Sequence, residues 1–238
     1  MNRILITLMT FTLIWSCSNN SKTTITSSID TSKFEGMNPD SVFNLAYEYY
    51  NAGDDANSKV IIEYAKKHGS KMALFSEALD EIAKGEKEKG KIILEKLYKQ
   101  KYPPAYYELG LLMLRENNPE YKTFLDSAIT LGENWVAGFL GFLYLEGKYY
   151  QGGIEYSTNI DTITGVKYLK ISALNGDYES QTRLGKYYFE IKEYDNAELF
   201  FKMSKESFEE YSKNNDQEVF DYSNEYLMKI DSARNTRR

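Results

Sequence analysis

The sequence predicts an all-α fold, a solenoid of about five helix-turn-helix repeats followed by a C-terminal capping helix. A composition of 42% hydrophobic and 27% charged residues is typical of a globular protein. A small residue returns at spacings of 32, 32, 31 and 44, at Ala46, Ala78, Gly110, Gly141 and Gly185. An acidic residue or Asn returns at spacings of 32, 31, 44 and 32, at Asp54, Glu86, Asn117, Asp161 and Glu193. Two independent markers with one period indicate stacked structural repeats.

The first 16 residues are predicted to be a secretory signal peptide. Arg3 precedes a mostly apolar run over residues 4–16, which is too short for a membrane span of about 20 residues. The segment that ends in Ser16 and Cys17 resembles the lipobox of bacterial lipoproteins, although Trp15 stands where a small residue is usual. That resemblance implies cleavage before Cys17 and lipid attachment to its thiol. An ordinary signal peptide with an incidental cysteine is the alternative.

Residues 17–38 are predicted to form the lipidated cysteine and a flexible tether, because they are rich in Ser, Thr and Asn. The chain is acidic, so the lipid rather than the protein surface has to hold it at a membrane, and several acyl chains hold stably where one does not. Ser18 after the cysteine fits outer-membrane sorting in lipoproteins of this type. We therefore expect a membrane-anchored lipoprotein of the bacterial cell envelope, on the outer membrane and facing the periplasm.

Residues 39–238 are predicted to form the helical repeat domain with its C-terminal capping helix. The first helix of a repeat is clearest over residues 103–117, where Tyr106, Leu109 and Met113 recur at helical spacing and two prolines stand near the start. The second helix is clearest over residues 161–176, where Asp161 has the place of an N-cap and Gly176 that of a C-terminal stop. A single helix pair cannot bury its apolar face alone, whereas stacked pairs can.

The fourth repeat carries an insertion of about a dozen residues, which explains its longer spacing of 44. A loop of that length in a compact repeat is typical of a functional segment, or it is a harmless lengthening. Gly152 and Gly153 give it turn freedom. Its candidate contacts are the apolar and aromatic residues Tyr149, Tyr150, Ile154 and Tyr156.

Residues 216–238 are predicted to form the capping helix, with apolar residues at helical spacing and a polar outer face. The terminal arginines Arg234, Arg237 and Arg238 are interpreted as a solvated end. His68 follows two lysines at a helix end, where a cation complements the helix dipole, so a structural or surface role is predicted for it.

The repeat itself resembles the Sel-one-like (SEL-like) repeat, a relative of the tetratricopeptide repeat (TPR). The matching places of the fourth repeat and the start of the fifth hold Asp161, Gly165, Tyr168, Ser172, Ala173, Gly176, Ser180, Leu184 and Gly185. The final repeat is closer to the tetratricopeptide form. The resemblance covers residues 39–212 and is loose in the first two repeats, where Glu77 occupies a leucine place. It implies a right-handed α-solenoid that acts as an interaction scaffold.

The family geometry implies a groove lined by positions one and four residues after each small residue. These candidate groove residues are Tyr47, Tyr50, Leu79, Ile82, Leu111, Leu114, Phe142, Leu145, Lys186 and Phe189. Nine of the ten are apolar or aromatic, which predicts a groove for an apolar or amphipathic partner segment. The alternative is that tightly wound helices make these residues part of the core.

Composition argues against several other classes of function. The formal net charge of -6 is dispersed along the chain, so no basic face is present to bind nucleic acid. Cys17 and His68 are the sole residues of their types, which removes disulfide frameworks, Cys/His zinc sites and most catalytic triads. We find no phosphate loop, nucleophile motif or metal-ligand spacing, and we expect no cofactor and no enzymatic activity.

The sequence thus predicts an envelope lipoprotein that binds an unidentified protein or peptide. Two sharper versions are an immunity or inhibitor protein that neutralises a toxin in the periplasm, and an accessory subunit of an outer-membrane assembly complex. A carboxylate-dependent hydrolase of envelope polysaccharide remains an alternative, which requires two carboxyl groups in different environments. Binding of a small hydrophobic molecule is a third class, which requires an enclosed apolar cavity.

Overall fold

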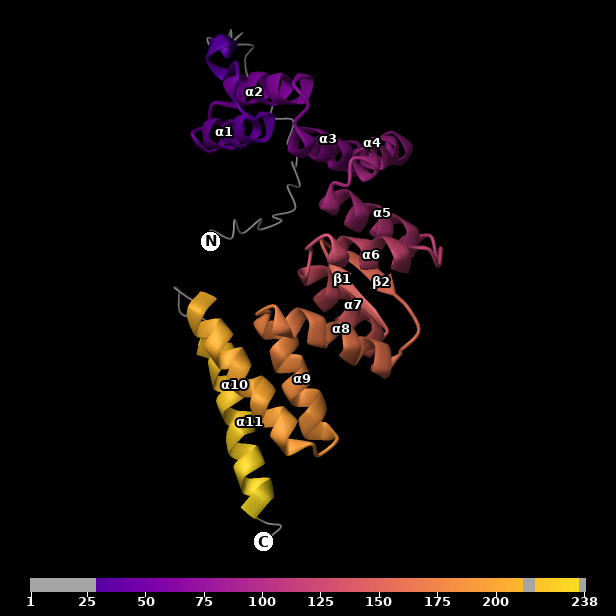
Figure 1. Ribbon diagram of the computed structural model, residues 1–238, viewed down its shortest axis with the longest axis vertical. Helices are drawn as coiled ribbons and strands as arrows, with labels where there is room; N and C mark the ends of the chain where they lie inside the picture. Colours follow the sequence, from indigo (N-terminus) through magenta and orange to yellow (C-terminus); the bar gives the residue numbers. More distant parts are fainter. Residues whose placement is uncertain (1–28, 212–216, 236–238) are drawn as a thin grey trace. The chain divides into compact units, whose positions relative to one another are not determined.

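The computed structural model describes residues 29–211 and 217–235, so the predicted signal peptide and Cys17 lie outside the described residues. The described chain is built of α-helices, with one short 3-10 helix and two short strands (Figure 1). In chain order the elements are η1 (Thr31–Phe34), α1 (Pro39–Asn51), α2 (Asp55–Lys67), α3 (Lys71–Ala83), α4 (Lys87–Lys99), α5 (Pro103–Arg115), α6 (Tyr121–Thr130), α7 (Trp135–Glu146), β1 (Lys148–Gln151), β2 (Ile154–Ser157), α8 (Thr162–Leu174), α9 (Tyr178–Glu190), α10 (Tyr194–Tyr211) and α11 (Gln217–Asn235).

The predicted repeat is confirmed by the positions of the recurring small residues. Each lies in the first helix of a pair, in α1, α3, α5, α7 and α9, and each is buried: Ala46, Ala78, Gly110, Gly141 and Gly185. A small residue is needed at these positions because the two helices of a pair approach each other closely there. A Cβ on Gly110 would lie 2.6 Å from the side chain of Leu125 in α6, and one on Gly185 would lie 2.9 Å from the ring of Phe201 in α10. The helices form the all-α solenoid organisation that the sequence predicts.

The second set of markers is confirmed in part. The carboxylates of Asp54 and Asp161 accept hydrogen bonds from the backbone N–H groups of Asn57 and Thr164, which makes both residues N-caps. Glu86 also occupies an N-cap position but makes no side-chain capping bond. Asn117, the one marker of this set that is not acidic, is not a helix cap. Its φ of 54° places it in the left-handed region after α5, and α6 begins only at Tyr121.

The described part of the chain divides into two compact units, one that ends at residue 105 and one that begins at residue 106. The core of the first unit contains side chains from η1, α1, α2 and α3: Phe34, Val42, Ala46, Ile61, Ala65 and Ala73. At the end of α2, Lys66 pairs with Glu77 of α3 at 3.2 Å, which accounts for a glutamate in a leucine place. His68 is the exposed C-cap of α2 and stacks on Tyr64 with a centroid distance of 3.9 Å, in agreement with a structural role.

The predicted flexible tether extends too far along the chain. Within residues 17–38, the part that the structure describes begins at Ile29, whose backbone N–H donates to Oδ1 of Asn57 at 3.2 Å. Asp30 then caps η1, and Phe34 is buried with its ring edge against Tyr64. Burial of the Phe34 ring stabilises this segment although the residues around it are polar. The folded unit therefore starts before residue 39.

The second unit has two clusters of buried side chains. The first lies among α5, α6, α7 and the β strands and includes Tyr107, Leu140 and Leu143. The second lies among α8, α9, α10 and α11 and includes Leu184 and Phe201. Helix α7 is buried on nearly all sides, because its sequence WVAGFLGFLYLE is apolar throughout.

The insertion of the fourth repeat is a β-hairpin rather than an open loop. Strands β1 and β2 pair antiparallel, with Tyr149 opposite Tyr156 and Gln151 opposite Ile154. Gly152 and Gly153 both have positive φ, as a two-residue hairpin turn of the primed type requires. Strand β1 packs on α7 (Figure 1). The chain is therefore not entirely helical, because alternating apolar residues on β1 and β2 pack one face of the hairpin on the helices.

Helix α11 is the predicted capping helix, and it packs along α10 and α9 (Figure 1). Ile230 is fully buried, while Tyr222 and Tyr226 pack partly buried against the cluster that contains Phe201. Arg234 does not belong to a solvated end, because it pairs with Glu198 at 2.6 Å and with Asp195, both on α10. Arg237 and Arg238 lie outside the described residues.

Among the helices that the structure describes, none combines the length and the apolar composition needed to cross a membrane.

Candidate functional site

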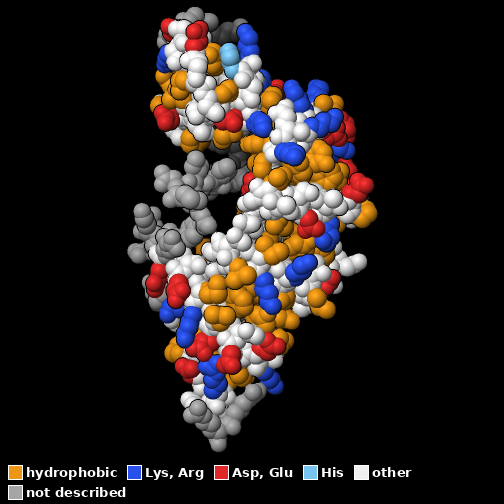
Figure 2. Space-filling view, viewed as in Figure 1, with side chains coloured by type: hydrophobic (Ala, Val, Ile, Leu, Met, Phe, Trp, Pro, Cys, Tyr) orange, Lys and Arg blue, Asp and Glu red, His pale blue; other side chains and the backbone are white. Residues whose placement is uncertain are grey.

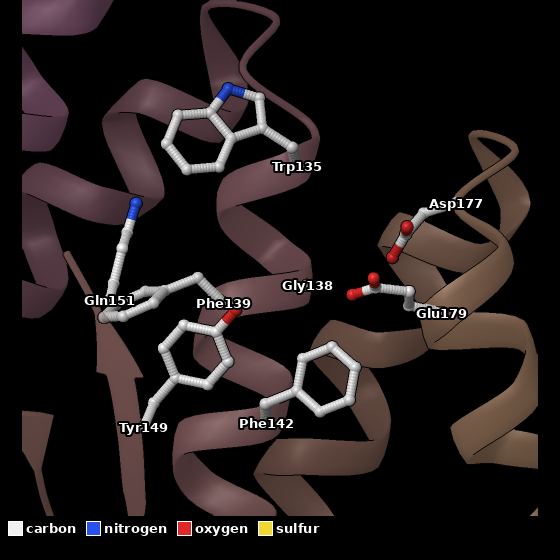
Figure 3. A pocket seen from close by; sticks show the side chains of 8 residues that line it. All are labelled: Trp135, Gly138, Phe139, Phe142, Tyr149, Gln151, Asp177 and Glu179. Carbon is white, nitrogen blue, oxygen red and sulfur yellow. The ribbon is translucent and has the colours of Figure 1, made fainter. Parts of the chain in front are cut away.

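A pocket of about 210 Å³ lies between α7, the hairpin and the start of α9 in the second unit (Figure 3). It is open to solvent. One part of its lining is aromatic and comes from α7 and β1, and another part is acidic and comes from the start of α9. The lining residues are Trp135, Gly138, Phe139, Phe142, Tyr149, Gln151, Asp177 and Glu179.

The aromatic part is built by one helix and one strand. Phe139 and Phe142 follow each other by three residues on the same face of α7, and Tyr149 of β1 packs on both. The ring of Tyr149 is perpendicular to that of Phe139 at a centroid distance of 5.2 Å and nearly parallel to that of Phe142 at 6.0 Å. Both arrangements are favourable for aromatic pairs. The hairpin register therefore brings Tyr149 to the pocket.

Trp135 begins α7 and remains 37% exposed, although two contacts hold it in place. Its ring lies edge-on against the buried ring of Tyr107 at 4.4 Å, and its indole N–H donates to Oε2 of Glu133 at 2.6 Å. Tyr107 in turn donates its hydroxyl hydrogen to Oε1 of Gln151 at 2.5 Å. These two contacts hold the partly exposed ring of Trp135 in one orientation.

The acidic part comes from the first turn of α9. Asp177 is the N-cap of this helix, and its Oδ2 accepts hydrogen bonds from the Ser172 hydroxyl at 3.0 Å and from the Ser180 backbone N–H at 3.1 Å. Glu179 lies two residues further on. In Figure 3 both carboxyl groups point toward the aromatic side chains from one side of the pocket. Gly138 permits this approach, because a Cβ there would lie 3.2 Å from Oδ2 of Asp177.

The two carboxyl groups influence each other and the tyrosine opposite. Partial burial raises the pKa of the Glu179 carboxyl group above its usual value, and the charge of Asp177 raises it further. Burial also raises the pKa of the Tyr149 hydroxyl, and the charges of Glu179 and Asp177 add to this effect. The pocket is therefore a region of negative potential that its own lining residues do not neutralise.

A neighbouring pocket of about 340 Å³ lies between the ends of α7 and α9 and the start of α8. It contains groups of both signs. Arg183 pairs with Glu146, and Lys186 lies 3.9 Å from Glu190. Because its charged side chains already pair with one another, this pocket has fewer charged groups free to bind a ligand than the first.

The predicted groove residues do not form one exposed stripe. Tyr47 and Tyr50 on α1 are exposed, while Leu79 and Ile82 on α3 are partly buried. Leu111 and Leu114 on α5 are buried, with 6% and 4% of their surface exposed, so their assignment to an accessible groove is wrong and the core alternative holds for them. They lie on the face of α5 that packs in the first core cluster of the second unit.

The remaining groove candidates are partly buried on α7 and α9. Phe142 lines the aromatic pocket, and Leu145 and Lys186 line the neighbouring one. Phe189 packs edge-on against Tyr226 of α11 at 5.2 Å, so it serves mainly to attach the capping helix.

The hairpin candidates divide according to the two faces of the strands. Tyr149 lines the pocket and Ile154 packs against the core cluster beside it, whereas Tyr150 is 59% exposed. Tyr156 is 5% exposed and contacts Phe139 in the core, so its prediction as an accessible contact is wrong.

Trp135, Gln151, Asp177 and Glu179 were not predicted as site residues. A signal was available for Trp135, because it is the only tryptophan after the N-terminal segment. The two carboxylates follow Gly176 at a predicted helix start, where acidic residues are expected for capping alone. Nothing in their spacing distinguishes a binding role from a cap.

Acidic and basic side chains are interspersed over the face shown in Figure 2. Within the described ranges, no group of three His, Cys, Asp or Glu residues is placed to hold a metal ion.

Comparison with solved structures identifies the fold. A Sel1 repeat protein from Oxalobacter formigenes matches over 85% of this chain and 92% of its own, with 16% identity and a TM-score of 0.55. The chain has the Sel1-like repeat fold. A protective antigen of uropathogenic Escherichia coli with an SLR fold matches over 82% of this chain and 47% of its own, with 18% identity and a TM-score of 0.51.

The Sel1-like repeat likeness is one of structure, since no family model and no curated protein matches the sequence. The immunity protein Pa5087 from Pseudomonas aeruginosa matches with 19% identity and a TM-score of 0.45, over 81% of this chain and 82% of its own. That score is too low to support an inference about function.

Proposed function

We propose that this protein is a protein-binding scaffold of the bacterial cell envelope, anchored by a lipid on Cys17, and that the aromatic pocket is a contact site for its partner. The exposed, fixed ring of Trp135 is the observation that carries the proposal. Tryptophan and tyrosine dominate the binding energy of protein interfaces because they bury a large area with few rotatable bonds.

The construction of the pocket supports this role. The side chains around Trp135 and Tyr149 are fixed by ring contacts and by the hydrogen bond from Tyr107 to Gln151. A partner that binds a preorganised surface loses less side-chain entropy, about 0.5–1.5 kcal/mol for each rotamer-rich side chain that is already immobile. Site residues held on helices and a hairpin are also positioned more reproducibly than residues on an open loop.

The positions of the two carboxyl groups favour binding over hydrolysis. A carboxylate-dependent glycosidase needs its two carboxyl groups on opposite sides of the scissile bond. Asp177 and Glu179 both extend from the first turn of α9, on one side of the pocket (Figure 3). Asp177 is also committed to capping its helix through Oδ2. This geometry suits recognition of charge better than acid and base chemistry.

Site-specific photocrosslinking in intact cells tests the contact. A photoreactive phenylalanine derivative, p-benzoylphenylalanine, replaces Trp135 in one strain and Ile92 in a control strain. Ile92 on α4 is 66% exposed and lies in the other compact unit. The expected result is one discrete adduct from position 135 that is absent from position 92. Equal adduct patterns at both positions, or no adduct at position 135, would overturn the proposed contact.

Identification of the adduct by mass spectrometry separates the two sharper versions of the function. A single secreted toxin supports an immunity or inhibitor role. A subunit of an outer-membrane barrel complex supports the accessory role.

The lipid anchor is tested separately with a Cys17→Ser variant. The wild type is expected to incorporate a labelled fatty acid and to fractionate with outer membranes, because acylation supplies the apolar area that the acidic protein surface lacks. The variant is expected to do neither. Labelling that persists in the variant, or a wild-type protein found entirely in the soluble fraction, would contradict the anchor.

A further inference from the structure

The lining of the aromatic pocket contains two carboxyl groups and no basic side chain. Asp177 and Glu179 are among the lining residues, and no lysine or arginine is. Arg183 lies beside the pocket, with its guanidinium 5.5 Å from the ring centroid of Phe142, but it pairs with Glu146 and lines the neighbouring pocket. Two negative charges therefore face the opening with aromatic rings beside them.

The charge of Asp177 is fixed in position. Two hydrogen bonds from Ser172 and Ser180 hold its Oδ2, and the absent side chain of Gly138 leaves room for it against α7. Because these donors are not cations, they orient the carboxylate and do not remove its charge. The start of α9 offsets part of that charge through the helix dipole, by about half an elementary charge.

Glu179 adds a second carboxyl group to the pocket. The helix dipole at the start of α9 does not balance the charge of both carboxyl groups. Its carboxyl group has a raised pKa because of burial and of its neighbour Asp177, and the same two charges act on the hydroxyl of Tyr149. A positive group placed in the pocket relieves both repulsions.

The aromatic side supplies the second element of cation recognition. Trp135, Phe142 and Tyr149 line the opening, and the face of an aromatic ring attracts a cation within about 6 Å. A planar guanidinium can stack on a ring and donate to carboxylate oxygens at the same time, whereas an ammonium acts as a point charge. A pocket of about 210 Å³ admits one side chain of this size.

We propose that this pocket binds one cationic side chain of the partner protein, and that it takes arginine in preference to lysine. The inference rests on the proposed function for the source of the side chain, since it names the chemistry of the partner at that same site. The carboxylates of Asp177 and Glu179 bind the guanidinium, and the rings of Trp135 and Tyr149 cover its faces.

A titration with small probes tests the chemistry without knowledge of the partner. The protein is the full chain carrying Trp15→Phe, so that Trp135 gives the single indole N–H signal in an NMR spectrum of 15N-labelled protein. The probes are N-acetylarginine methylamide, the lysine equivalent, and the citrulline equivalent, which has the shape of arginine without its charge. Arginine is expected to shift the Trp135 signal with an affinity in the millimolar range, about tenfold tighter than citrulline and tighter than lysine.

Variants locate the binding in the pocket. Asp177→Asn combined with Glu179→Gln removes both charges and keeps the helix cap, because asparagine caps as well as aspartate. This double variant is expected to weaken arginine binding about tenfold. The matched control is Glu206→Gln with Glu209→Gln, which removes two charges from exposed positions on α10 and is expected to bind like the parent. If the first double variant does not fold, Glu179→Gln alone replaces it, because Glu179 does not cap α9.

Equal binding of citrulline and arginine, or unchanged arginine binding in the pocket variants, would overturn this inference. The outcome is independent of the crosslinking experiment. If a partner is crosslinked at position 135 but citrulline binds as tightly as arginine, the scaffold function is supported and the cation site is refuted. If arginine binds selectively but no partner is crosslinked, the cation site is supported and the proposed function is refuted.

Discussion

The backbones of Gly165 and Gly141 approach so closely that a Cβ on Gly165 would lie 3.1 Å from the carbonyl oxygen of Gly141. It would also lie 2.9 Å from the backbone nitrogen of Leu145. The two glycines lie where α8 packs against α7. Helix α7 also carries three aromatic residues of the pocket: Trp135, Phe139 and Phe142. The close approach of the two helices therefore supports the site as well as the repeat.

Gly165→Ala is expected to cost about 2–3 kcal/mol by overpacking, the upper part of the usual range, because the contacts are with backbone atoms that cannot move aside. Alanine has a higher helix propensity than glycine by about 1 kcal/mol, so we expect a net destabilisation of about 1–2 kcal/mol. Urea denaturation followed by circular dichroism measures the change. Lys167→Ala on the exposed face of the same helix is the control, with an expected change within about 0.5 kcal/mol. A Gly165→Ala variant as stable as the control would show that α7 and α8 separate without cost.

Two serines beside the pocket are expected to respond in opposite directions. The hydroxyl of Ser180 is buried and has no hydrogen-bond partner within the described part of the chain, so Ser180→Ala removes an unsatisfied polar group. We expect the variant to be more stable by about 1 kcal/mol. The hydroxyl of Ser172 donates to Asp177 at 3.0 Å, and Ser172→Ala is expected to cost about 1 kcal/mol. Thermal or urea unfolding of both variants checks the pair, and changes of the same sign in both would refute this account.

The positions of the small residues could be predicted because they depend on one local requirement that recurs. Gly110, Gly141 and Gly185 each lie where a second helix of the same pair crosses, and the spacing of the repeat is therefore visible in the sequence. Asp54 and Asp161 could be predicted as caps for a similar reason, since capping involves residues only three positions apart.

The pocket could not be predicted, because it depends on contacts between distant segments. Trp135 and Asp177 come from different repeats, and Tyr149 reaches α7 only through the register of the hairpin. A shift of that register by one residue would turn Tyr149 to the opposite face. The same limit explains Leu111 and Leu114, whose apolar character fits a groove and a core equally well until the neighbouring helices are in place.

A partly buried hydrogen bond between α8 and α6 gives a further prediction. The hydroxyl of Tyr168 donates to Oδ1 of Asp126 at 2.5 Å, and the tyrosine ring is buried. Tyr168→Phe is expected to lower the free energy of unfolding by about 1.5–3 kcal/mol, the range for hydrogen bonds to charged groups. Tyr150→Phe is the control, because the hydroxyl of Tyr150 bonds to Glu155 on the exposed face of the hairpin. A loss in the control as large as in Tyr168→Phe would argue against a special role for the α6–α8 bond.

The final prediction concerns the pH dependence of stability. Burial raises the pKa of Glu108 in α5 to about 7, although the positive charge of Arg115 acts in the opposite direction. A carboxyl group with a raised pKa binds its proton more tightly in the folded state than in the unfolded state, where its pKa is close to 4.5. Its contribution is therefore most favourable below pH 4.5 and is lost as the pH rises through 7.

Glu108→Gln keeps the shape of the side chain and removes the charge. We expect the variant to unfold like the wild type at pH 4.5 and to be more stable at pH 8 by about 1–3 kcal/mol, since each pKa unit corresponds to about 1.4 kcal/mol. Urea denaturation at pH 4.5, 6 and 8 measures this difference, with Glu206→Gln on exposed α10 as the control that should follow the wild type throughout. If the difference between Glu108→Gln and the wild type does not grow between pH 4.5 and 8, the charged form of Glu108 is not what destabilises the fold.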